Sequence, residues 1–240
     1  MSTGREILRS GAEQLGISLS AEQLQRFETY RAELADWNRR GNLTAITGEA
    51  EVVRLHFLDS LAVVLAWQPE EGDRVIDVGS GAGFPGLPLK LAFPGLHLTL
   101  LEATGKKTAF LEHLCSRLGL TGVEIIHGRA EEVAHRPGYR EAFNLVLSRA
   151  VAPLAALAEL TLPFCRVGGR AVLPKKGDVP AEVEAARPAT GLFGGRFAAT
   201  VPVGLPGLKD GRCLVVIEKV SPTPEKYPRR PGMPARRPLR

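Results

Sequence analysis

The residues best suited to chemistry are one carboxylate and the glycines that follow it. Asp77 interrupts a β-branched apolar segment, Val75–Val78, and such a segment favours a buried strand. Four glycines come next: Gly79, Gly81, Gly83 and Gly86. Glycines directly after a strand permit a tight turn and let backbone N–H groups approach a ligand closely. The pattern predicts the first strand–loop–helix unit of a nucleotide-binding α/β fold.

Two classes of ligand fit this loop by spacing. Gly81, Gly83 and Gly86 match G-x-G-x-x-G, the dinucleotide fingerprint, so an NAD-dependent oxidoreductase is one interpretation. Asp77 favours another, because a carboxylate at the strand end repels a pyrophosphate but not a cation. Written as Asp-x-Gly-x-Gly-x-Gly, the segment resembles motif I of the Rossmann-like methyltransferases. Their cofactor, S-adenosylmethionine (SAM), has a sulfonium and an ammonium but no phosphate. We therefore expect Asp77, Gly79, Gly81 and Gly83 to belong to a SAM site.

Two further acids follow later predicted strands. Glu102 ends the second strand, close to the spacing at which an acid binds ribose hydroxyls in dinucleotide folds. One carboxylate can accept hydrogen bonds from both hydroxyls, so we expect Glu102 to bind the ribose. Ala130 and Glu131 follow the third strand, where backbone groups of a methyltransferase meet the adenine edge. Glu131 has a second interpretation, as an acid that favours the dipole of a helix beginning there.

The end of the fourth predicted strand, Ser148–Ala150, indicates the type of reaction. It contains neither the Asp/Asn-Pro-Pro-aromatic motif that grips an exocyclic amine nor the Pro-Cys of an enzyme with a cysteine nucleophile. Arg149 instead favours an acceptor that is already nucleophilic, such as a ring nitrogen. Guanine N7 fits, because no proton has to leave it before attack. Arg149 would orient the SAM carboxylate, contact the target base or phosphate, or form a structural ion pair.

Two other kinds of site find no support in the sequence. The five histidines lack the paired spacing of metal ligands, and no cysteine joins them, so no metal is expected. The G-x-S-x-G elbow of a serine hydrolase is also missing.

Alternating strands and helices must position these residues. Residues 1–70 are predicted to be helical: Ser20 and Gln23 form a capping box, an apolar stripe runs to Gly41, and a second helix is expected at about 51–67. Strands are predicted at 74–78, 97–102, 123–127, 143–147, 170–173, 197–203 and 213–220, and helices at 106–118 and 151–164. The last two strands are joined by a short polar loop, which suggests an antiparallel edge.

The predicted fold class is therefore α/β. We expect a Rossmann-like SAM-dependent methyltransferase fold with a mainly parallel seven-stranded sheet and an antiparallel closing strand. The chain divides into an N-terminal helical cap (1–70), a SAM-binding methyltransferase domain (71–220) and a basic, proline-rich tail (221–240).

The positive charge of the chain is concentrated in that tail. The whole chain has a net charge of +5, and its last twenty residues contain six basic residues against one acid, Glu225, which also gives +5. The remainder is therefore neutral overall. A localised basic segment is typical of an arm that meets a polyanion. Its prolines predict an extended conformation without helix or strand.

The composition also bears on the compartment. No window of eighteen apolar residues predicts a transmembrane helix, and the first residues lack the apolar core of a signal peptide. Cys115, Cys165 and Cys213 are odd in number and isolated, without a disulfide pattern. We expect a cytoplasmic protein without a membrane partner.

Together these segments resemble the RsmG (GidB) family of bacterial small-subunit rRNA guanine-N7 methyltransferases. The resemblance covers about residues 42–240 and is carried by Asn42–Ile46, His56–Leu61, Asp77–Pro88, Arg129–Glu131, Ser148–Ala150, Lys176–Gly177 and Tyr227–Gly232. It implies SAM contacts at Gly79, Phe84, Glu102, Ala103, Thr104, Ala130, Glu131 and Arg149. It also implies a target guanine in the 530 loop of 16S rRNA, at the decoding site.

The resemblance implies direct methyl transfer from SAM to guanine N7, with S-adenosylhomocysteine as the product and no covalent enzyme intermediate. The partner would be 16S rRNA, either in the small ribosomal subunit or in an assembly intermediate, and the enzyme is expected to be a monomer. Basic residues of the tail and of loops near the site are the RNA-binding candidates: Lys175, Lys176, Arg212, Lys226, Arg229 and Arg230. Arg212 is equally suited to pair with Asp210.

Three questions stay open at this point. His56, Asp59 and Ser60 share a region of one predicted helix and either cover the SAM pocket, touch RNA or form a packing cluster. Residues 1–41 match no pattern of the family, so they have no assigned role. A non-catalytic ribosome-assembly factor that keeps a nucleotide-binding fold is an alternative to the enzyme.

Overall fold

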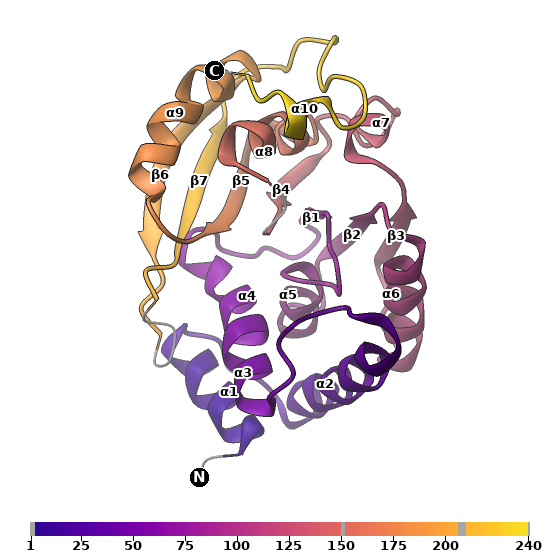
Figure 1. Cartoon of the computed structure of the whole chain (residues 1–240). Coiled ribbons are helices and arrows are strands. Elements are labelled where there is room, and N and C mark those ends of the chain that lie inside the picture. Colours follow the sequence, from indigo (N-terminus) through magenta and orange to yellow (C-terminus); the bar gives the residue numbers. More distant parts are fainter. Residues whose placement is uncertain (1–2, 150–151, 206–209, 240) are drawn as a thin grey trace.

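A single mixed sheet forms the centre of the protein (Figure 1). The computed structural model describes residues 3–149, 152–205 and 210–239. Within them, seven strands follow the order β3–β2–β1–β4–β5–β7–β6. Their bounds are β1 (Arg74–Val78), β2 (His97–Glu102), β3 (Val123–His127), β4 (Phe143–Leu147), β5 (Cys165–Lys175), β6 (Gly195–Pro202) and β7 (Cys213–Lys219). The first five strands are parallel, and β7 is antiparallel to both of its neighbours, β5 and β6.

Helices surround the sheet. The N-terminal ones are α1 (Gly4–Gln14), α2 (Ala21–Gly41), α3 (Glu49–Val52), η1 (Val53–Leu58), α4 (Asp59–Leu61) and η2 (Ala62–Leu65). Those that follow strands are α5 (Gly86–Ala92), α6 (Gly105–Arg117), α7 (Ala130–Val133), α8 (Leu154–Thr161) and α9 (Val179–Leu192), and α10 (Met233–Arg236) lies near the C-terminus. The predicted α/β fold, the parallel strands and the antiparallel closing strand are thereby confirmed.

Two hydrophobic clusters cover the two faces of the sheet. Successive strand residues alternate between them, as the pleat requires. Val75 and Leu145 pack with the N-terminal helices, α5 and α6, whereas Ile76 and Val146 pack with α8 and α9. Because β1, β2 and β4 are neighbours and parallel, their carboxyl ends meet at one edge of the sheet. That edge carries the residues that the sequence singles out.

Local expectations for the N-terminal helices are met in part. The capping box of α2 is present, because Ser20 Oγ accepts from Gln23 N–H and Gln23 accepts from Ser20 N–H. The helix expected at 51–67 is instead four short pieces, and η1 among them is a π-helix. A π-turn inserts an extra residue into a helix, so the inward-facing stripe shifts there, and such turns are frequent at functional sites. His56 lies within η1.

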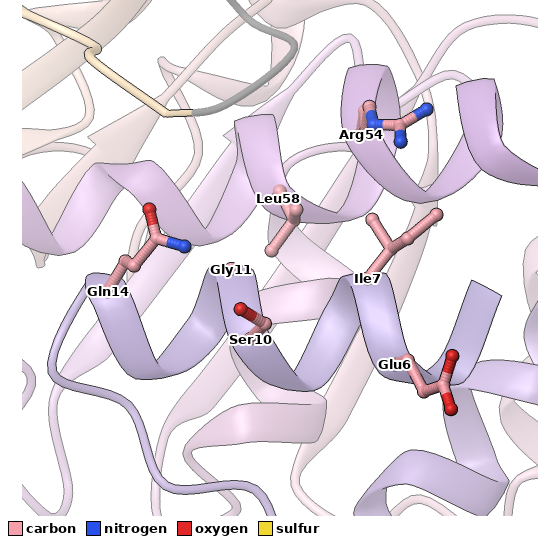
Figure 2. A pocket seen from close by; sticks show the side chains of 7 residues that line it. All are labelled: Glu6, Ile7, Ser10, Gly11, Gln14, Arg54 and Leu58. Carbon is pink, nitrogen blue, oxygen red and sulfur yellow. The ribbon is translucent and has the colours of Figure 1, made fainter. Parts of the chain in front are cut away.

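Helix α1 packs closely against η1, and a hollow of about 190 Å³ lies along their contact (Figure 2). Gly11 permits this approach, because a Cβ there would come within 2.4 Å of Leu58 Cδ1. Ser10, Gln14 and Arg54 line the hollow, and its lining includes no residue of the glycine loop. The N-terminal helix is thereby fixed to the segment that carries His56.

The C-terminal segment differs from the expectation of an extended arm without helix or strand. It contains the short helix α10, and it lies against the domain rather than away from it (Figure 1). Arg140 donates to the carbonyl oxygens of Thr223 and Tyr227, at 2.8 and 2.9 Å. Arg229 pairs with the buried Glu159 at 2.6 Å. Polar groups of the domain therefore bind this backbone, which overrides the preference of a proline-rich sequence for an open, solvated chain.

The other predicted bounds agree closely with the structure, except for β5 and the helix before it. β5 begins at Cys165, earlier than expected, because Cys165 pairs with Phe143 of β4. The helix expected at 151–164 is observed as α8, while Ala150 and Val151 lie outside the described residues.

Candidate active site

The glycine loop between β1 and α5 has the backbone that only glycine adopts easily. Gly79, Gly81 and Gly83 have φ angles of 75°, 60° and 97°. A Cβ at Gly81 would make one ordinary van der Waals contact, with Gly79 O at 3.9 Å, and would meet nothing closer. A Cβ at Gly83 would lie 2.7 Å from the Tyr30 hydroxyl, and one at Gly86 would lie 3.0 Å from Asp77 Oδ2. Gly81 thus leaves room for a ligand, while Gly83 and Gly86 make room for protein.

Asp77 is fully buried at the end of β1. Its Oδ2 accepts from the N–H of Gly86, the first residue of α5, at 2.9 Å. Its Oδ1 is buried and has no hydrogen-bond partner within the described part of the chain. Burial raises the pKa of this carboxyl to about 7, against the opposing effect of the Gly86 hydrogen bond. An orphaned carboxylate oxygen beside the loop fits a cationic ligand and opposes a pyrophosphate.

Glu102 closes the loop from the side of β2. Its carboxylate accepts from Gly81 N–H at 2.9 Å and from Thr104 N–H at 2.8 Å. The loop is further joined to β2 because Gly79 N–H donates to Leu101 O at 2.8 Å. The structure therefore brings Asp77, the glycine loop and Glu102 to one edge of the sheet. The open space at Gly81 and these two carboxylates suit SAM as a cofactor.

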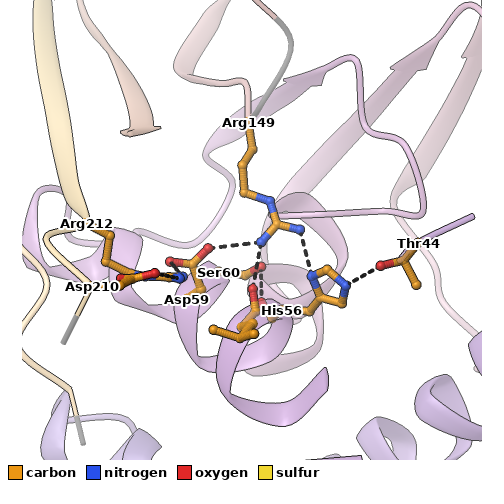
Figure 3. Close-up of polar contacts among 8 residues, drawn as sticks. Thr44, His56, Asp59, Ser60, Arg149, Asp210 and Arg212 are labelled. Atoms are coloured by element: carbon orange, nitrogen blue, oxygen red, sulfur yellow. Dashed lines mark hydrogen bonds and ion pairs between the residues drawn. The ribbon is translucent and has the colours of Figure 1, made fainter. Parts of the chain in front are cut away.

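Arg149 follows β4 and is bound by the N-terminal cap (Figure 3). Its guanidinium donates to Asp59 Oδ2 at 3.0 Å, to Leu55 O at 3.2 Å and to His56 Nδ1 at 3.1 Å. A guanidinium can only donate, so His56 Nδ1 is the acceptor and its Nε2 carries the proton, which it donates to Thr44 Oγ1 at 2.8 Å. Burial and the charge of Arg149 lower the pKa of His56 to about 3, which keeps the ring neutral.

A second arginine shares Asp59. Arg212 Nη1 lies 2.7 Å from Asp59 Oδ1, and its Nε and Nη2 donate to Asp210 at 2.7 and 2.6 Å (Figure 3). The Arg212 guanidinium holds the pKa of Asp210 at about 2. The pairing of Arg212 with Asp210 that the sequence suggested is therefore present. Asp59 links the cap to the ends of β4 and β7.

A hollow of about 480 Å³ opens beside this network. Its lining includes Leu55, His56, Asp59, Arg149, Lys176 and Arg212. Over the whole lining, two arginines and two lysines stand against Asp59 and Asp210, which gives this surface a positive balance. A hollow that is cationic and has an apolar wall suits a nucleotide with its phosphate.

Phe84 connects the glycine loop to Arg149 and the cap. Its ring stacks on His56, with centroids 4.4 Å apart, and on Tyr30, with centroids 5.2 Å apart. The Arg149 guanidinium carbon lies 5.1 Å from the centre of the same ring. His56 and Asp59 therefore contact the candidate site. Ser60 donates to His56 O within its own helix turn.

The remaining predicted site residues have varied surroundings. Glu131 lies in the first turn of α7 and accepts from Gly232 N–H at 2.8 Å, and Ala103 O accepts from His127 Nε2 at 3.1 Å. Lys175 pairs with Glu182 at 2.7 Å. Lys176 is exposed and lines the hollow.

The tail residues fall into two groups. Lys226 and Arg230 are exposed, whereas Arg229 is held by Glu159 through hydrogen bonds of 2.6 to 3.1 Å. Arg229 therefore forms an ion pair that joins the tail to α8, while Lys226 and Arg230 face solvent.

Three residues with structural roles, two at the site and one beneath the C-terminal segment, are not among the predicted site residues. Tyr30 was part of no motif, because its partner in the loop lies far along the chain. Thr44 orients His56 from a loop. Glu159 could have been noticed as the one acid in an otherwise apolar helix, since a buried carboxylate requires a partner.

Two features are absent from the described residues. These residues contain no helix long and apolar enough to cross a membrane. They also contain no group of three or more histidine, cysteine or acidic side chains arranged to hold a metal ion.

The strand order, the open glycine loop after β1 and the acid at the end of β2 define the class of Rossmann-like SAM-dependent methyltransferases. Solved structures share this fold. TrmN from Thermus thermophilus has a TM-score of 0.53 at 19% identity, covering 68% of this chain and 48% of its own. A SAM-dependent methyltransferase from Aquifex aeolicus has a TM-score of 0.50 at 17% identity, covering 71% and 93%.

Sequence comparison identifies the family. A model of the family described as "GidB: rRNA small subunit methyltransferase G" matches residues 23–201. Proteins named ribosomal RNA small subunit methyltransferase G are similar over almost the whole length. The one from Dehalococcoides mccartyi (strain CBDB1) is 56% identical, covering 95% of this chain and 97% of its own, and that of Roseiflexus castenholzii is 50% identical, covering 98% and 99%. The chain therefore belongs to the rRNA small subunit methyltransferase G family.

Membership confirms the predicted family and the methyltransferase class, and the fold neighbours confirm the Rossmann-like architecture. Family membership leaves no support for the interpretation of the chain as an NAD-dependent oxidoreductase. The use of SAM follows at the level of the family and fold.

Proposed function

We propose that this protein transfers the methyl group of SAM to N7 of a guanine in the 530 loop of 16S rRNA. The product would be S-adenosylhomocysteine. The substrate would be the small ribosomal subunit or its assembly intermediate in the cytoplasm, and the enzyme would act as a monomer. The names of the relatives, which act on small-subunit rRNA, support the substrate class.

The position of Arg149 is the observation that carries the choice of acceptor. The end of β4 presents a guanidinium bound to His56 and Asp59, where amine methyltransferases need an amine-gripping motif. The thiols offer no alternative nucleophile. All three cysteines are buried, and burial raises the pKa of Cys115 and Cys165 to about 12 and also raises that of Cys213. A ring nitrogen with an available lone pair needs neither an amine-gripping motif nor a cysteine nucleophile.

The chain's own residues would act mainly by alignment. Bound SAM supplies an electrophilic methyl group on a sulfonium. Glu102 would accept from the ribose hydroxyls, the backbone at Gly79–Phe84 would line the nucleoside, and Ala103, Thr104, Ala130 and Glu131 would border the adenine. Arg149 would orient the SAM carboxylate or the target nucleotide. Because guanine N7 has no proton to lose, no general base is required, and orientation supplies most of the rate enhancement.

RNA would first meet exposed basic residues. Lys176 at the hollow and Lys226 and Arg230 on the tail are free to face phosphates. Lys175, Arg212 and Arg229 are engaged in ion pairs with Glu182, Asp59 and Asp210, and Glu159. We therefore assign the main phosphate contacts to the exposed group, with Arg212 contributing from the rim of the hollow.

A pair of matched glycine variants tests the cofactor site. Gly81 and Gly119 have φ angles of 60° and 59°, and at neither would a Cβ meet an atom closer than 3.9 Å. Gly81→Ala and Gly119→Ala therefore carry the same backbone strain, of about 1–2 kcal/mol, and differ only in location. We expect Gly81→Ala to weaken SAM binding in calorimetry at least 10-fold and Gly119→Ala to leave it unchanged. Equal effects of the two variants on SAM binding would contradict the assignment of the SAM site to this loop.

Activity is tested with labelled SAM. The wild-type protein should bind SAM and not NAD, and it should transfer label to small ribosomal subunits. Binding of SAM without any transfer to subunits, assembly intermediates or 16S rRNA would favour the non-catalytic assembly factor. Binding of NAD in place of SAM would overturn the methyltransferase.

A further inference from the structure

The N-terminal helix α2 reaches into the glycine loop through one side chain. Tyr30 is fully buried, and its hydroxyl donates to the carbonyl oxygen of Ala82 at 2.5 Å. Ala82 lies between Gly81, the open position of the loop, and Gly83. Burial raises the pKa of the Tyr30 phenol well above its ordinary value, so the hydroxyl keeps its proton and remains a donor at physiological pH.

The ring of Tyr30 holds the same loop by a second contact. It stacks on Phe84 with an interplanar angle of 3° and a centroid separation of 5.2 Å. His56, from η1, stacks on Phe84 at an angle of 15°. Phe84 is therefore in contact with the cap through two different helices.

The loop is shaped to accept Tyr30. Gly83 has no Cβ, and one built there would lie 2.7 Å from the Tyr30 hydroxyl and 2.5 Å from Leu87 Cδ1. A side chain at Gly83 would expel the hydroxyl from its place. The third glycine of the loop thus serves the contact with α2, whereas the second, Gly81, faces open space.

The loop needs such a restraint because glycines lose more backbone freedom on ordering than other residues. Glu102 restrains Gly81 N–H from one side. That carboxylate is also the expected partner of the ribose hydroxyls, so its bond to the loop must be shared with the cofactor. The bond between Tyr30 and Ala82 O has no such competitor. It joins the backbone hydrogen bonds from Gly79 and Ser80 N–H to Leu101 O in holding the loop.

We propose that Tyr30 is a positioning residue of the cofactor site, which fixes the glycine loop by holding the Ala82 carbonyl. The proposal rests on SAM binding at this loop. It gives the N-terminal cap, which the family model matches from residue 23 onward, a part in the cofactor site.

The test compares two tyrosines that each lose one hydroxyl. Tyr30→Phe removes the hydrogen bond to Ala82 O and keeps the stacking ring. Tyr139→Phe is the control for loss of a hydroxyl away from the loop, because the Tyr139 hydroxyl also donates a 2.5 Å hydrogen bond, in this case an exposed one to Glu124 Oε1 of β3. Calorimetry should show SAM binding about 5- to 10-fold weaker for Tyr30→Phe, as expected for one lost hydrogen bond, and unchanged for Tyr139→Phe. The KM for SAM should rise in Tyr30→Phe, while kcat at saturating SAM should stay near the wild-type value.

A second readout needs no cofactor. Hydrogen exchange of the backbone amides of residues 79–87 in the free protein should be faster in Tyr30→Phe and unchanged in Tyr139→Phe. This measurement separates the present proposal from the proposed function, because it remains informative if the wild-type protein fails to bind SAM.

General destabilisation is controlled by Leu157→Ala. Leu157 belongs to the hydrophobic cluster on the other face of the sheet. The Leu157→Ala variant should have a lower melting temperature, but its affinity for SAM and the hydrogen exchange of its loop amides should be unchanged. Unchanged SAM affinity and unchanged loop exchange in Tyr30→Phe would overturn the proposal. So would a loss of SAM affinity in Leu157→Ala that matches the loss in Tyr30→Phe.

Discussion

The two ends of the chain pack against different parts of the protein: the N-terminal cap binds the glycine loop and Arg149, whereas the C-terminal segment binds α7 and α8. The N-terminal cap contacts the glycine loop through neutral groups, the Tyr30 hydroxyl and the stacked rings of Phe84 and His56. The C-terminal segment contacts the domain through charged groups. Arg229 pairs with a buried Glu159, and Glu131, at the start of α7, accepts from Gly232 N–H.

This difference sets what each end contributes. A neutral hydrogen bond contributes about 0.5–1.5 kcal/mol, so its loss changes local geometry more than the stability of the fold. Removing one partner of a buried ion pair strands a charge and costs about 3–5 kcal/mol. We infer that the C-terminal segment mainly secures the fold around α7 and α8, while the cap mainly tunes the cofactor loop.

The largest effect is expected from Arg229→Met. It leaves the Glu159 carboxylate, whose side chain is only 1% exposed, without its ion-pair partner. The free energy of unfolding, measured by urea denaturation, should fall by about 3–5 kcal/mol. Adding Glu159→Gln should recover a substantial part of the loss, because the stranded charge is then removed. A loss below about 1 kcal/mol would show that the segment is an accessory arm after all.

Arg149→Ala should have the largest effect on catalysis. The guanidinium is held by Leu55, His56 and Asp59, so its position is fixed before the substrate arrives. The single-turnover rate of methyl transfer at saturating SAM should fall on the order of 100-fold, the cost of a misplaced reacting pair. If the rate at saturating SAM is unchanged and only the KM for SAM rises, Arg149 serves the cofactor carboxylate alone.

The protonation of Asp77 should make SAM binding depend on pH. Burial raises the pKa of this carboxyl to about 7, so it is largely protonated in the free protein below that pH. A cationic cofactor favours the ionised form, and binding therefore releases a proton. The affinity for SAM should rise as pH increases, by about 5- to 10-fold between pH 6 and pH 8. Asp77→Asn should bind more weakly and lose this dependence. A wild-type affinity that falls over the same range would contradict the assignment.

The same raised pKa has the opposite effect on the stability of the free protein. The unfolded chain releases the Asp77 proton near pH 4, whereas the folded protein keeps it until about pH 7. The folded state therefore binds more protons between these values. The contribution of Asp77 to stability is present at low pH and is lost as pH rises from about 4 to 7. The free energy of unfolding of the wild type, relative to that of Asp77→Asn, should therefore fall as pH rises from about 4 to 7.

The smallest effects are expected from the exposed basic residues of the tail. Lys226→Ala and Arg230→Ala remove charges that face solvent, so the free energy of unfolding should change by less than about 0.5 kcal/mol. Each should weaken rRNA binding and reduce the salt dependence of the binding constant by about one unit of slope. Arg187→Ala is the control, because Arg187 is exposed, belongs to α9 rather than to the tail and pairs with Glu184 of the same helix. An equal effect of the control would deny the tail a specific role in RNA binding.

How far the sequence could predict the site depended on how local each interaction is. The glycine loop, Asp77 and Glu102 follow strand ends, and strand ends are recognisable from apolar runs and glycines. The capping box of α2 is equally local and was predicted correctly. Tyr30 could not be found, because its hydroxyl meets a backbone carbonyl 52 positions away, and no pattern of side chains reports such a contact.

Two features of the fold were also beyond the sequence pattern. The apolar stripe at 51–67 predicts one regular helix, and nothing in it signals the π-turn that places His56. The charge and prolines of the last twenty residues predict an extended arm when that segment is considered alone. They do not reveal that Glu159, Arg140 and Glu131 of the domain supply partners for it. Composition records what a segment contains, whereas packing depends on what lies opposite.

The position of the transferred methyl group tests the whole account most directly. Small ribosomal subunits are methylated by the purified protein with labelled SAM, and the 16S rRNA is then reduced and cleaved with aniline, which breaks the chain at N7-methylguanine. We expect a single labelled guanine in the 530 loop that is cleaved by this treatment. Label that resists cleavage because it lies on an exocyclic amine or a ribose would contradict the acceptor inferred from Arg149.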